Sequence, residues 1–405
     1  MTTTDKFTNI SIAVFLVTYV GLYYAEYLVF VWIGYLLLGS AIILNILQKR
    51  RCARSGLIFI GITIIFVLLA YFSSIWSYDY DETLNAASQL LKTVVIILLM
   101  VSLINNEQRL RIALFWLSVG SVIYGLLYLQ HVDLSTLGSD RLSYSTFDSS
   151  DSDNLPNYNV VSMYVAYAAV YFTWLIVDNQ TSKYKILNIA FLIAAVVAVF
   201  IFGSRKSILM MALGVLYFLF GPRAKSSVRI KLFILVFSSI LIALTILPET
   251  YVNYIFSRFD NIFGGSGKIE LDGSDMIRME MINDGLSWFW EKPILGNGFY
   301  SFPSLFGNKT GLFMYAHNNY VELLCDLGII GFILFYYPII RPIVVGRRIL
   351  KYSPLTSVLF ILGLLNILGS MFIVTYLDRT SWLLSSSIFV GINMEYIRIK
   401  SLNKL

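Results

Sequence analysis

A histidine stands where a polar stretch gives way to apolar residues. His317 is followed by Asn318 and Tyr320, and the apolar residues after them predict a helix on which Glu322 lies about one turn further along. Imidazole exchanges protons near neutral pH, so His317 is a candidate general base for a sugar hydroxyl, with Glu322 to orient it or to bind sugar. Alternatively, these polar residues only begin the helix, with Asn318 or Asn319 as its N-cap, or contact lipid headgroups.

Two further positions carry cations that suit phosphate. Arg205 and Lys206 lie in a short, serine-flanked connection between two apolar segments, and Arg278 lies on a segment that is predicted to form an amphipathic helix. A guanidinium offers a fork of donors and an ammonium offers a point charge, and both bind phosphate oxygens. The alternatives are that Arg205 and Lys206 extend to lipid headgroups, and that Arg278 forms an ordinary surface ion pair with Asp275 or Glu280.

Other kinds of catalytic or cofactor site have no motif in this sequence. Metal-protease, nucleotide-phosphate and nucleophile-elbow patterns are absent. Asp79–Asp81 has the form of a metal and nucleotide-sugar motif, but it falls on the expected outer face, whereas nucleotide sugars are cytoplasmic. Cys52 and Cys325 fall in a basic loop and an apolar helix, which disfavours a disulfide, and His131 is expected to be an ordinary loop residue. We therefore expect no metal, nucleotide or redox cofactor.

Membrane helices must position these residues. Of the 405 residues, 58% are hydrophobic and only 13% are charged, which excludes an ordinary soluble protein. Apolar segments long enough to cross a bilayer recur along the chain, so we expect an all-α integral membrane protein with about twelve transmembrane helices. The expected spans are residues 9–24, 27–47, 56–76, 84–104, 112–130, 158–178, 185–203, 206–220, 230–247, 318–340, 353–376 and 381–397.

The basic residues predict the orientation of these helices. Most Lys and Arg residues fall in the termini and in alternate loops, all on one side of the twelve-span arrangement. Cytoplasmic loops carry such an excess, so both termini are expected in the cytoplasm. The net charge of +6 has the same explanation, and no basic patch with interleaved aromatic residues indicates nucleic-acid binding.

Two long polar segments fall on the opposite, extracytoplasmic side. Residues 131–157 form a polar and mostly acidic loop, and residues 248–317 form the largest loop. Within the larger loop, apolar residues of 275–290 recur at nearly helical spacing and predict an amphipathic helix over the membrane surface. Loops this long in a compact protein are usually functional. We expect one polytopic domain, residues 1–405, that carries both loops.

Several sequence elements, in this order, resemble the superfamily of O-antigen ligases and Wzy-type O-antigen or capsular polysaccharide polymerases. They are Gly203–Lys206, the large loop with Arg278, Pro293–Gly298, and His317–Tyr320 leading to Leu327–Gly331. The resemblance implies a lipid-sugar-dependent, GT-C-like glycosyltransferase bundle in the bacterial inner (plasma) membrane, with its active site facing the extracytoplasmic side. It also implies an inverting transfer that uses a glycan linked to undecaprenyl diphosphate and no metal.

The resemblance also implies roles for individual residues. Arg205 and Arg278 match the family's two arginines for the lipid diphosphate, and Lys206 is expected to bind it too, at a position that varies in the family. His317 matches the family's histidine, a candidate base on the acceptor hydroxyl. Further positions expected to support the site or to bind sugar are Asn318, Tyr320 and Glu322.

The expected activity is that of a repeat-unit polymerase for capsule or lipopolysaccharide. Such an enzyme transfers a glycan from undecaprenyl diphosphate to the non-reducing end of another lipid-linked repeat unit, so the expected partners are donor and acceptor lipids, membrane lipids and a chain-length regulator. Enzyme alternatives are an O-antigen ligase that uses lipid A-core as acceptor, and an oligosaccharyltransferase that acts on protein. From other classes, a non-catalytic scaffold and a lipid-linked oligosaccharide transporter stay open, although the one large loop breaks the symmetry between halves that transporters show.

Overall fold

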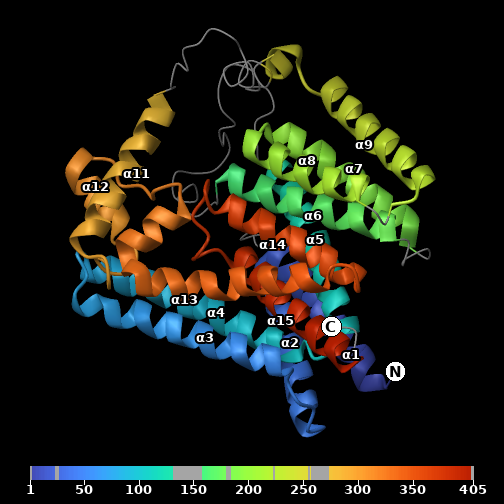
Figure 1. Ribbon diagram of the computed structural model, residues 1–405, viewed down its shortest axis with the longest axis horizontal. Coiled ribbons are helices and arrows are strands. Elements are labelled where there is room, and N and C mark those ends of the chain that lie inside the picture. The colour runs from blue at the N-terminus through green and yellow to red at the C-terminus, as the bar shows by residue number, and fades with distance from the viewer. Residues whose placement is uncertain are drawn as a thin grey trace. The chain divides into compact units, whose positions relative to one another are not determined.

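The structure is a computed structural model that describes residues 2–22, 27–130, 157–178, 184–221, 224–253, 256 and 273–402. Most of these residues are helical, and none of them lies in a β-strand (Figure 1). The helices are α1 (Thr3–Leu16), a π-helix (Val17–Gly21), α2 (Leu28–Leu47), α3 (Arg54–Phe72), a 3-10 helix (Ser73–Ile75), α4 (Tyr80–Leu103), α5 (Glu107–Gln130), α6 (Tyr158–Asp178), α7 (Lys185–Phe202), α8 (Arg205–Phe220), α9 (Ser226–Ile246), α11 (Gly273–Glu291), α12 (Phe302–Thr310), α13 (Asn319–Ile349), α14 (Pro354–Gly369) and α15 (Arg379–Ser401).

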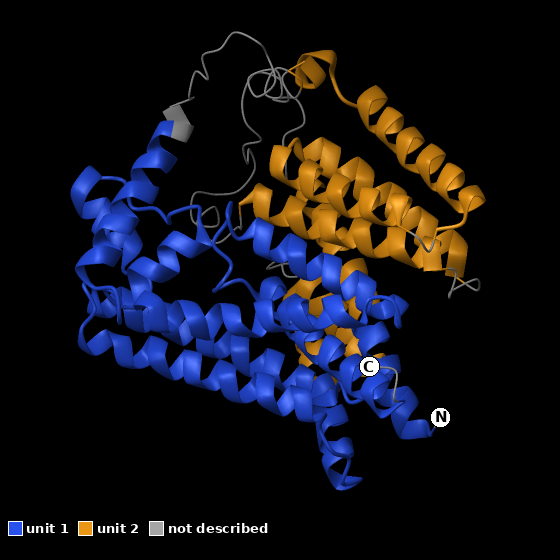
Figure 2. Ribbon diagram, viewed as in Figure 1, with its two compact units in different colours: residues 1–9, 38–113, 271–405 blue, residues 10–37, 114–270 orange. Residues whose placement is uncertain are grey.

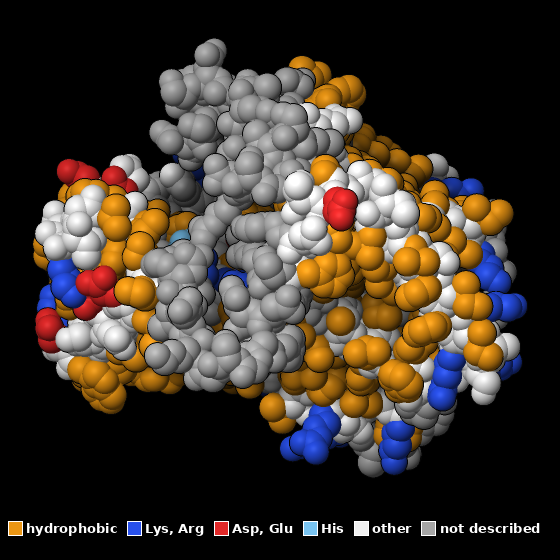
Figure 3. Space-filling model, turned by 90° about the horizontal axis from the view of Figure 1, so that it is seen from above, with side chains coloured by type: hydrophobic (Ala, Val, Ile, Leu, Met, Phe, Trp, Pro, Cys, Tyr) orange, Lys and Arg blue, Asp and Glu red, His pale blue; other side chains and the backbone are white. Residues whose placement is uncertain are grey.

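Eight of these helices are long and apolar enough to cross a bilayer, counted over the described residues: α2, α3 with its 3-10 extension, α4, α5, α6, α7, α9 and α13. Hydrophobic side chains also cover much of the surface seen in Figure 3, as expected of helices that face lipid. The prediction of a helical integral membrane protein is therefore confirmed. Each of the twelve expected spans overlaps a helix, but α1, α8, α14 and α15 are shorter or more polar. The count of twelve crossings stays a prediction.

The chain divides into two compact units (Figure 2). Unit 1 comprises residues 1–9, 38–113 and 271–405, and unit 2 comprises residues 10–37 and 114–270. In unit 2, helix α6 packs against α7, α8 and α9, and almost all of its side chains are buried. In unit 1, helices α3, α4, α13, α14 and α15 pack against one another (Figure 1). Of the two expected loops, residues 131–156 lie outside the described residues, and the larger one contains α11 and α12.

One end of unit 1 gathers basic residues. Asp5 accepts hydrogen bonds from Arg50 and Arg109, and the buried Arg109 also donates to Asn45 Oδ1 (3.3 Å) and to the Leu103 carbonyl (3.0 Å). The hydrogen bond from Arg50 holds the pKa of Asp5 below its usual range. Nearby ion pairs are Arg111–Glu107 (2.9 Å), Arg398–Glu107 (3.6 Å) and Arg398–Glu395 (2.5 Å). These contacts join the start of α1, the ends of α2 and α4, the start of α5 and the end of α15.

The opposite end of unit 1 carries the beginning of α13, the end of α14 and the beginning of α15. Helix α13 is interrupted there at Gly328, whose φ of 58° and ψ of −161° only glycine adopts readily. The segment Pro293–Gly298 lies against this interruption. In a continuous helix, two N–H groups after Gly328 would bond to two carbonyl groups before it. Here all four of these groups form hydrogen bonds to Pro293–Gly298 instead. These four bonds join Ile329 N to Pro293 O (2.9 Å), Ile330 N to Ile294 O (3.4 Å), Asn297 N to Cys325 O (2.9 Å) and Gly298 N to Asp326 O (2.8 Å).

Glycine is required on both sides of this junction. A Cβ added at Gly328 would lie 2.4 Å from the Ile294 carbonyl oxygen, and one added at Gly296, which has a φ of 67°, would lie 2.4 Å from the Asp326 carbonyl oxygen. Two backbones that approach this closely leave no room for side chains. The junction therefore fixes the segment before α12 to the beginning of α13, where the polar residues lie.

Candidate active site

His317 lies in the turn that leads into α13, at the end of unit 1 opposite the basic residues. Its φ of 53° is one of three positive values among the described non-glycine residues, and its ring lies 4.2 Å from the ring of Tyr315. Asn318 is the N-cap, because its side chain accepts hydrogen bonds from the N–H groups of Tyr320 (3.0 Å) and Val321 (3.2 Å). The imidazole is half-buried. A capped helix start and a left-handed backbone thus determine where this side chain points.

Glu322 holds the backbone on the other side of His317. Its side chain is completely buried, and its Oε2 accepts a hydrogen bond from the N–H of Ala316 at 2.6 Å. Its other oxygen, Oε1, accepts from the hydroxyl of Tyr376 at 2.7 Å. A buried carboxylate needs such partners, since burial without them is costly. Glu322 therefore connects the residue before His317 to the segment between α14 and α15.

Asn319 makes a second connection to that segment. The side chain of Asn319 is buried, and its Oδ1 accepts from the N–H groups of Thr375 (2.7 Å) and Tyr376 (3.3 Å), while its Nδ2 donates to the Tyr336 hydroxyl (2.7 Å). Its own backbone N–H donates to the Ser370 carbonyl at 2.9 Å. Non-helical backbone between α14 and α15 thereby has partners for its polar groups, as buried backbone requires.

Asp326, one turn after Glu322, organises the segment before α12. Its carboxylate is buried and accepts from the N–H groups of Tyr300 (3.0 Å) and Phe302 (2.9 Å), and its Oδ2 lies 3.2 Å from the Tyr376 hydroxyl oxygen. Tyr300 also has a positive φ, 61°. Burial, followed by the charges of nearby carboxylates, Glu322 first, raises the pKa of Tyr300 to about 12. At neutral pH Tyr300 is therefore a neutral phenol that can donate a hydrogen bond.

The turn between α3 and α4 anchors the same segment. The N–H of Phe299 donates to Ser73 Oγ (2.9 Å), and the Phe299 carbonyl accepts from Thr83 Oγ1 (2.7 Å). Asp79 caps α4 by accepting from the N–H of Glu82 (3.1 Å), and its other oxygen accepts from the hydroxyl of Ser304 (2.9 Å). The carboxylate of the Asp79–Asp81 motif is thus engaged in holding helix ends together.

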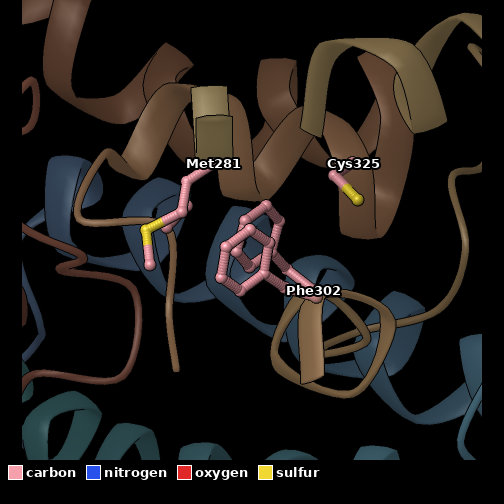
Figure 4. Packing of buried hydrophobic residues seen from close by; sticks show 5 residues of the cluster. Met281, Phe302 and Cys325 are labelled. Atoms are coloured by element: carbon pink, nitrogen blue, oxygen red, sulfur yellow. The ribbon is translucent and has the colours of Figure 1, made fainter. Parts of the chain in front are cut away.

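Helix α11 packs on the beginning of α13 and carries Arg278. Met281, Phe302 and Cys325 belong to one buried apolar cluster (Figure 4), and a Cβ at Gly285 would lie 2.4 Å from Val321. Positions three and seven residues apart share one face of a helix. Arg278 therefore lies on the same face of α11 as Met281 and Gly285, the face turned toward α13, and its side chain is half-buried.

Tyr320 is also engaged within this end of unit 1. Its hydroxyl donates to the Ile367 carbonyl of α14 at 2.7 Å, and its ring stacks on Tyr336 with 4.8 Å between centroids. These contacts attach the first turn of α13 to α14. Asn318, Tyr320 and Glu322 thus each make hydrogen bonds that hold the first turn of α13 or the residue before His317.

Arg205 and Lys206 belong to unit 2. They are the first two residues of α8. Helix α7 ends at Gly203, which has a φ of 59°, and the buried Ser204 is the N-cap residue of α8. Of the predicted site residues, unit 1 therefore holds Arg278, His317 and the residues that follow it, and unit 2 holds these two cations. His131 lies outside the described residues.

From the sequence alone, Asn319 was predicted only as a possible N-cap. Asp326 and Tyr376 were not predicted to belong to the site. A signal was present for Asp326, because an acidic residue four positions after Glu322, in an otherwise apolar helix, is expensive in a membrane and therefore marks a function or a partner. Tyr376 carried no such signal. Its partners on α13 are about fifty positions away in the chain.

Comparison with known proteins gives one family match. No curated protein matches the chain. Residues 189–336 match the O-antigen ligase family, Wzy_C, and this range begins in α7, ends in α13 and includes Arg205, Arg278 and His317. The match supports the resemblance seen in the sequence to the superfamily of O-antigen ligases and Wzy-type polymerases, and within residues 189–336 the chain is similar to O-antigen ligases.

Proposed function

We propose that this protein is a Wzy-type polymerase that transfers a glycan from undecaprenyl diphosphate to the non-reducing end of another lipid-linked repeat unit. The observation that carries the proposal is the placement of His317. The half-buried imidazole of His317 lies at the start of a helix, and the backbone of His317 is left-handed. The buried Glu322 accepts a hydrogen bond from the N–H of the preceding residue. Unusual backbone held by its surroundings is typical of functional sites.

In the proposed reaction His317 acts as the general base. The acceptor hydroxyl gives its proton to the imidazole while its oxygen attacks the anomeric carbon of the donor glycan. A carbon–oxygen bond forms there as the bond to the diphosphate breaks, and the anomeric configuration inverts in this one displacement. Undecaprenyl diphosphate leaves with the bonding electron pair. No metal or nucleotide takes part.

Arg205, Lys206 and Arg278 are the groups we propose for the leaving diphosphate. Charge that develops on a phosphate is stabilised by cations held in place before the reaction. Arg205 and Lys206 begin α8, where backbone N–H groups of the first helical turn also favour an anion. Arg278 lies on the face of α11 that is turned toward α13. In this proposal the buried Glu322 supports the backbone beside His317, and Asn318 and Tyr320 support His317 and the acceptor sugar.

We also propose that the protein lies in the bacterial inner membrane with both termini in the cytoplasm and the end of unit 1 that carries His317 outside. The basic residues at the opposite end of unit 1 support this orientation, because positive residues are retained on the cytoplasmic side. The lipid-linked substrates would then meet His317 at the outer surface of the membrane.

The test is a reconstitution with one kind of substrate. Purified protein in vesicles receives only undecaprenyl-diphosphate-linked repeat units, and the products are separated by electrophoresis. A polymerase yields a ladder whose rungs differ by one repeat unit. Absence of a ladder, together with transfer to lipid A-core when that acceptor is added, would show a ligase instead.

The ligase is the second candidate because the matching family is described as O-antigen ligase. Both activities use the same donor chemistry and differ only in the acceptor, so the same residues serve either. A transporter would form no new glycosidic bond in this assay, which separates it from both enzymes.

A further inference from the structure

Two non-glycine residues with positive φ occur at the end of unit 1 that carries the site, Tyr300 and His317. At each of them, a buried carboxylate of α13 accepts a hydrogen bond from a backbone N–H group, either of the residue itself or of the residue before it. Glu322 accepts from the residue before His317, at 2.6 Å, and Asp326 accepts from Tyr300 itself, at 3.0 Å. The two carboxylates are four residues apart and therefore lie on one face of α13.

A single hydroxyl group joins these two carboxylates. The Tyr376 hydroxyl donates to Glu322 Oε1 at 2.7 Å and lies 3.2 Å from Asp326 Oδ2. The rest of Tyr376 is fixed independently of the hydroxyl. Its ring packs against Phe299 with 5.1 Å between centroids, and its carbonyl accepts from the indole N–H of Trp382 at 2.8 Å.

We propose that Tyr376 is a positioning residue for this site, whose hydroxyl fixes Glu322 and Asp326 and through them the backbone at His317 and Tyr300. This inference rests on the proposed function, in which His317 is the general base. Tyr376 does not touch the reacting groups in this account. It acts on the orientation of His317, and a small displacement of a catalytic group lowers the rate of the chemical step more than it lowers substrate binding.

The hydrogen bonds to Glu322 and Asp326 depend on the hydroxyl of Tyr376 and not on its ring. Without the Tyr376 hydroxyl, Glu322 Oε1 loses its hydrogen-bond donor inside a fully buried site. A buried carboxylate that has lost a donor must accept a hydrogen bond from another group or move. Any movement of Glu322 is transmitted to the Ala316 N–H that it holds. Asp326 keeps two backbone donors, so we expect the segment at Tyr300 to change less than the segment at His317.

The test uses Tyr376→Phe, which removes the hydroxyl and keeps the ring. Tyr71→Phe is the matched control, because Tyr71 also donates through its hydroxyl within unit 1, to Ser88 Oγ at 3.1 Å between α3 and α4. The chain has two histidines, so in a His131→Gln background a protein labelled with ¹⁵N-histidine reports on His317 alone. Glu322→Gln is the second variant. The glutamine amide has one acceptor oxygen, so it cannot accept from both the Ala316 N–H and the Tyr376 hydroxyl as the two carboxylate oxygens do.

We expect Tyr376→Phe to shift or broaden the His317 imidazole resonances and to lower kcat by about 10- to 100-fold, with KM close to that of wild type. Tyr71→Phe should leave both the spectrum and kcat unchanged. If Tyr376→Phe does not yield folded protein, Glu322→Gln must give the same pair of changes. An unchanged His317 spectrum together with an unchanged kcat, in either folded variant, would overturn the inference.

The spectrum and the rate also separate this inference from the proposed function. If His317→Ala retains full activity, the proposed function fails, whereas the spectrum of Tyr376→Phe still tests whether the hydroxyl positions the imidazole. If His317→Ala is inactive and Tyr376→Phe behaves as wild type in both measurements, only the positioning role is wrong.

Discussion

His317 combines a titratable side chain with backbone that non-glycine residues seldom adopt. Left-handed backbone costs roughly 1–2 kcal/mol for such residues, and here the capped start of α13 and the carboxylate of Glu322 hold it. A residue that served only to start a helix would not need this conformation. The conformation therefore favours the catalytic interpretation of His317 over the alternative of a simple helix start.

Arg278 gives the sharpest test of diphosphate binding. We expect Arg278→Gln to lower the rate of ladder formation by about 100-fold or more, because under the proposed function it removes a charge that stabilises the leaving group. Arg278→Lys keeps the charge and loses the fork of donors, so it should fall between wild type and Arg278→Gln. Quantified ladders from vesicles with equal amounts of protein provide the measurement.

The control for Arg278 is Lys292→Gln, which removes an exposed cation just after α11. It should leave the rate unchanged. Equal rates for wild type and Arg278→Gln would remove Arg278 from the mechanism and leave it as a surface residue.

At this scale, residues whose types are chemically conspicuous could be predicted from the sequence, and residues whose roles depend on distant partners could not. His317 and Glu322 were identified from their types and spacing. Asn318 and Asn319 were both candidate N-caps, and only the structure assigns the cap to Asn318 and a different role to Asn319. Tyr376 could not be found, because a tyrosine in a short connection says nothing about two carboxylates on another helix.

At the scale of elements, the interruption of α13 explains two motifs that the sequence presented only as a family resemblance. Pro293–Gly298 forms one junction with the backbone on both sides of Gly328, which donates from Ile329 and Ile330 and accepts at the two carbonyls of Cys325 and Asp326. The helices themselves follow from apolar runs and could be predicted. A break at Gly328 could not, since the partner segment that makes it favourable lies some thirty residues earlier in the chain.

Gly328→Ala should destabilise the protein. The backbone conformation there costs a non-glycine residue about 1–3 kcal/mol, and the added Cβ would meet the Ile294 carbonyl oxygen at 2.4 Å. We expect a lower melting temperature in detergent, measured by thermal unfolding, and loss of activity because the beginning of α13 shifts.

Gly61→Ala is the matched control for this glycine. Gly61 lies within α3, and its Cβ would meet nothing within 4 Å. Alanine should therefore be neutral or stabilise the helix by about 0.5–1 kcal/mol. A melting temperature for Gly328→Ala equal to that of Gly61→Ala would contradict the account of the junction.

At the scale of the whole molecule, the two ends of unit 1 carry different polar residues. One end carries the ion pairs of Asp5, Glu107 and Glu395 with arginines, and the other carries His317. Hydropathy and the distribution of basic residues predicted a polytopic helical membrane protein, which the structure confirms. They could not predict the division into two units, because it depends on packing between segments far apart in sequence.

Reporter fusions test the orientation. A reporter that is active only in the cytoplasm should be active when fused after Leu405, and one that is active only outside should be active when inserted before His317, at the exposed Leu312. The reverse pattern would place the proposed site on the cytoplasmic side, where its lipid-linked substrate is not expected.

Asp5 predicts how stability at the basic end depends on pH. Because Arg50 lowers the pKa of Asp5 in the folded state, its contribution is complete above the ordinary carboxyl pKa of about 3.9 and is lost as pH falls below it. Asp5→Asn should therefore melt below wild type at pH 7, and this difference should shrink as the pH is lowered below about 4. A difference that stays constant over this range would show that the charge of Asp5 does not stabilise the fold.

The central claim, that His317 is the base in glycan transfer from a lipid diphosphate, is tested most directly by one kinetic comparison. The initial rate of glycosidic bond formation is measured in vesicles that contain wild type, His317→Ala or the control His131→Ala, with equal amounts of folded protein. The account predicts that His131→Ala matches wild type and that His317→Ala is slower by at least about 100-fold. A wild-type rate for His317→Ala would contradict it.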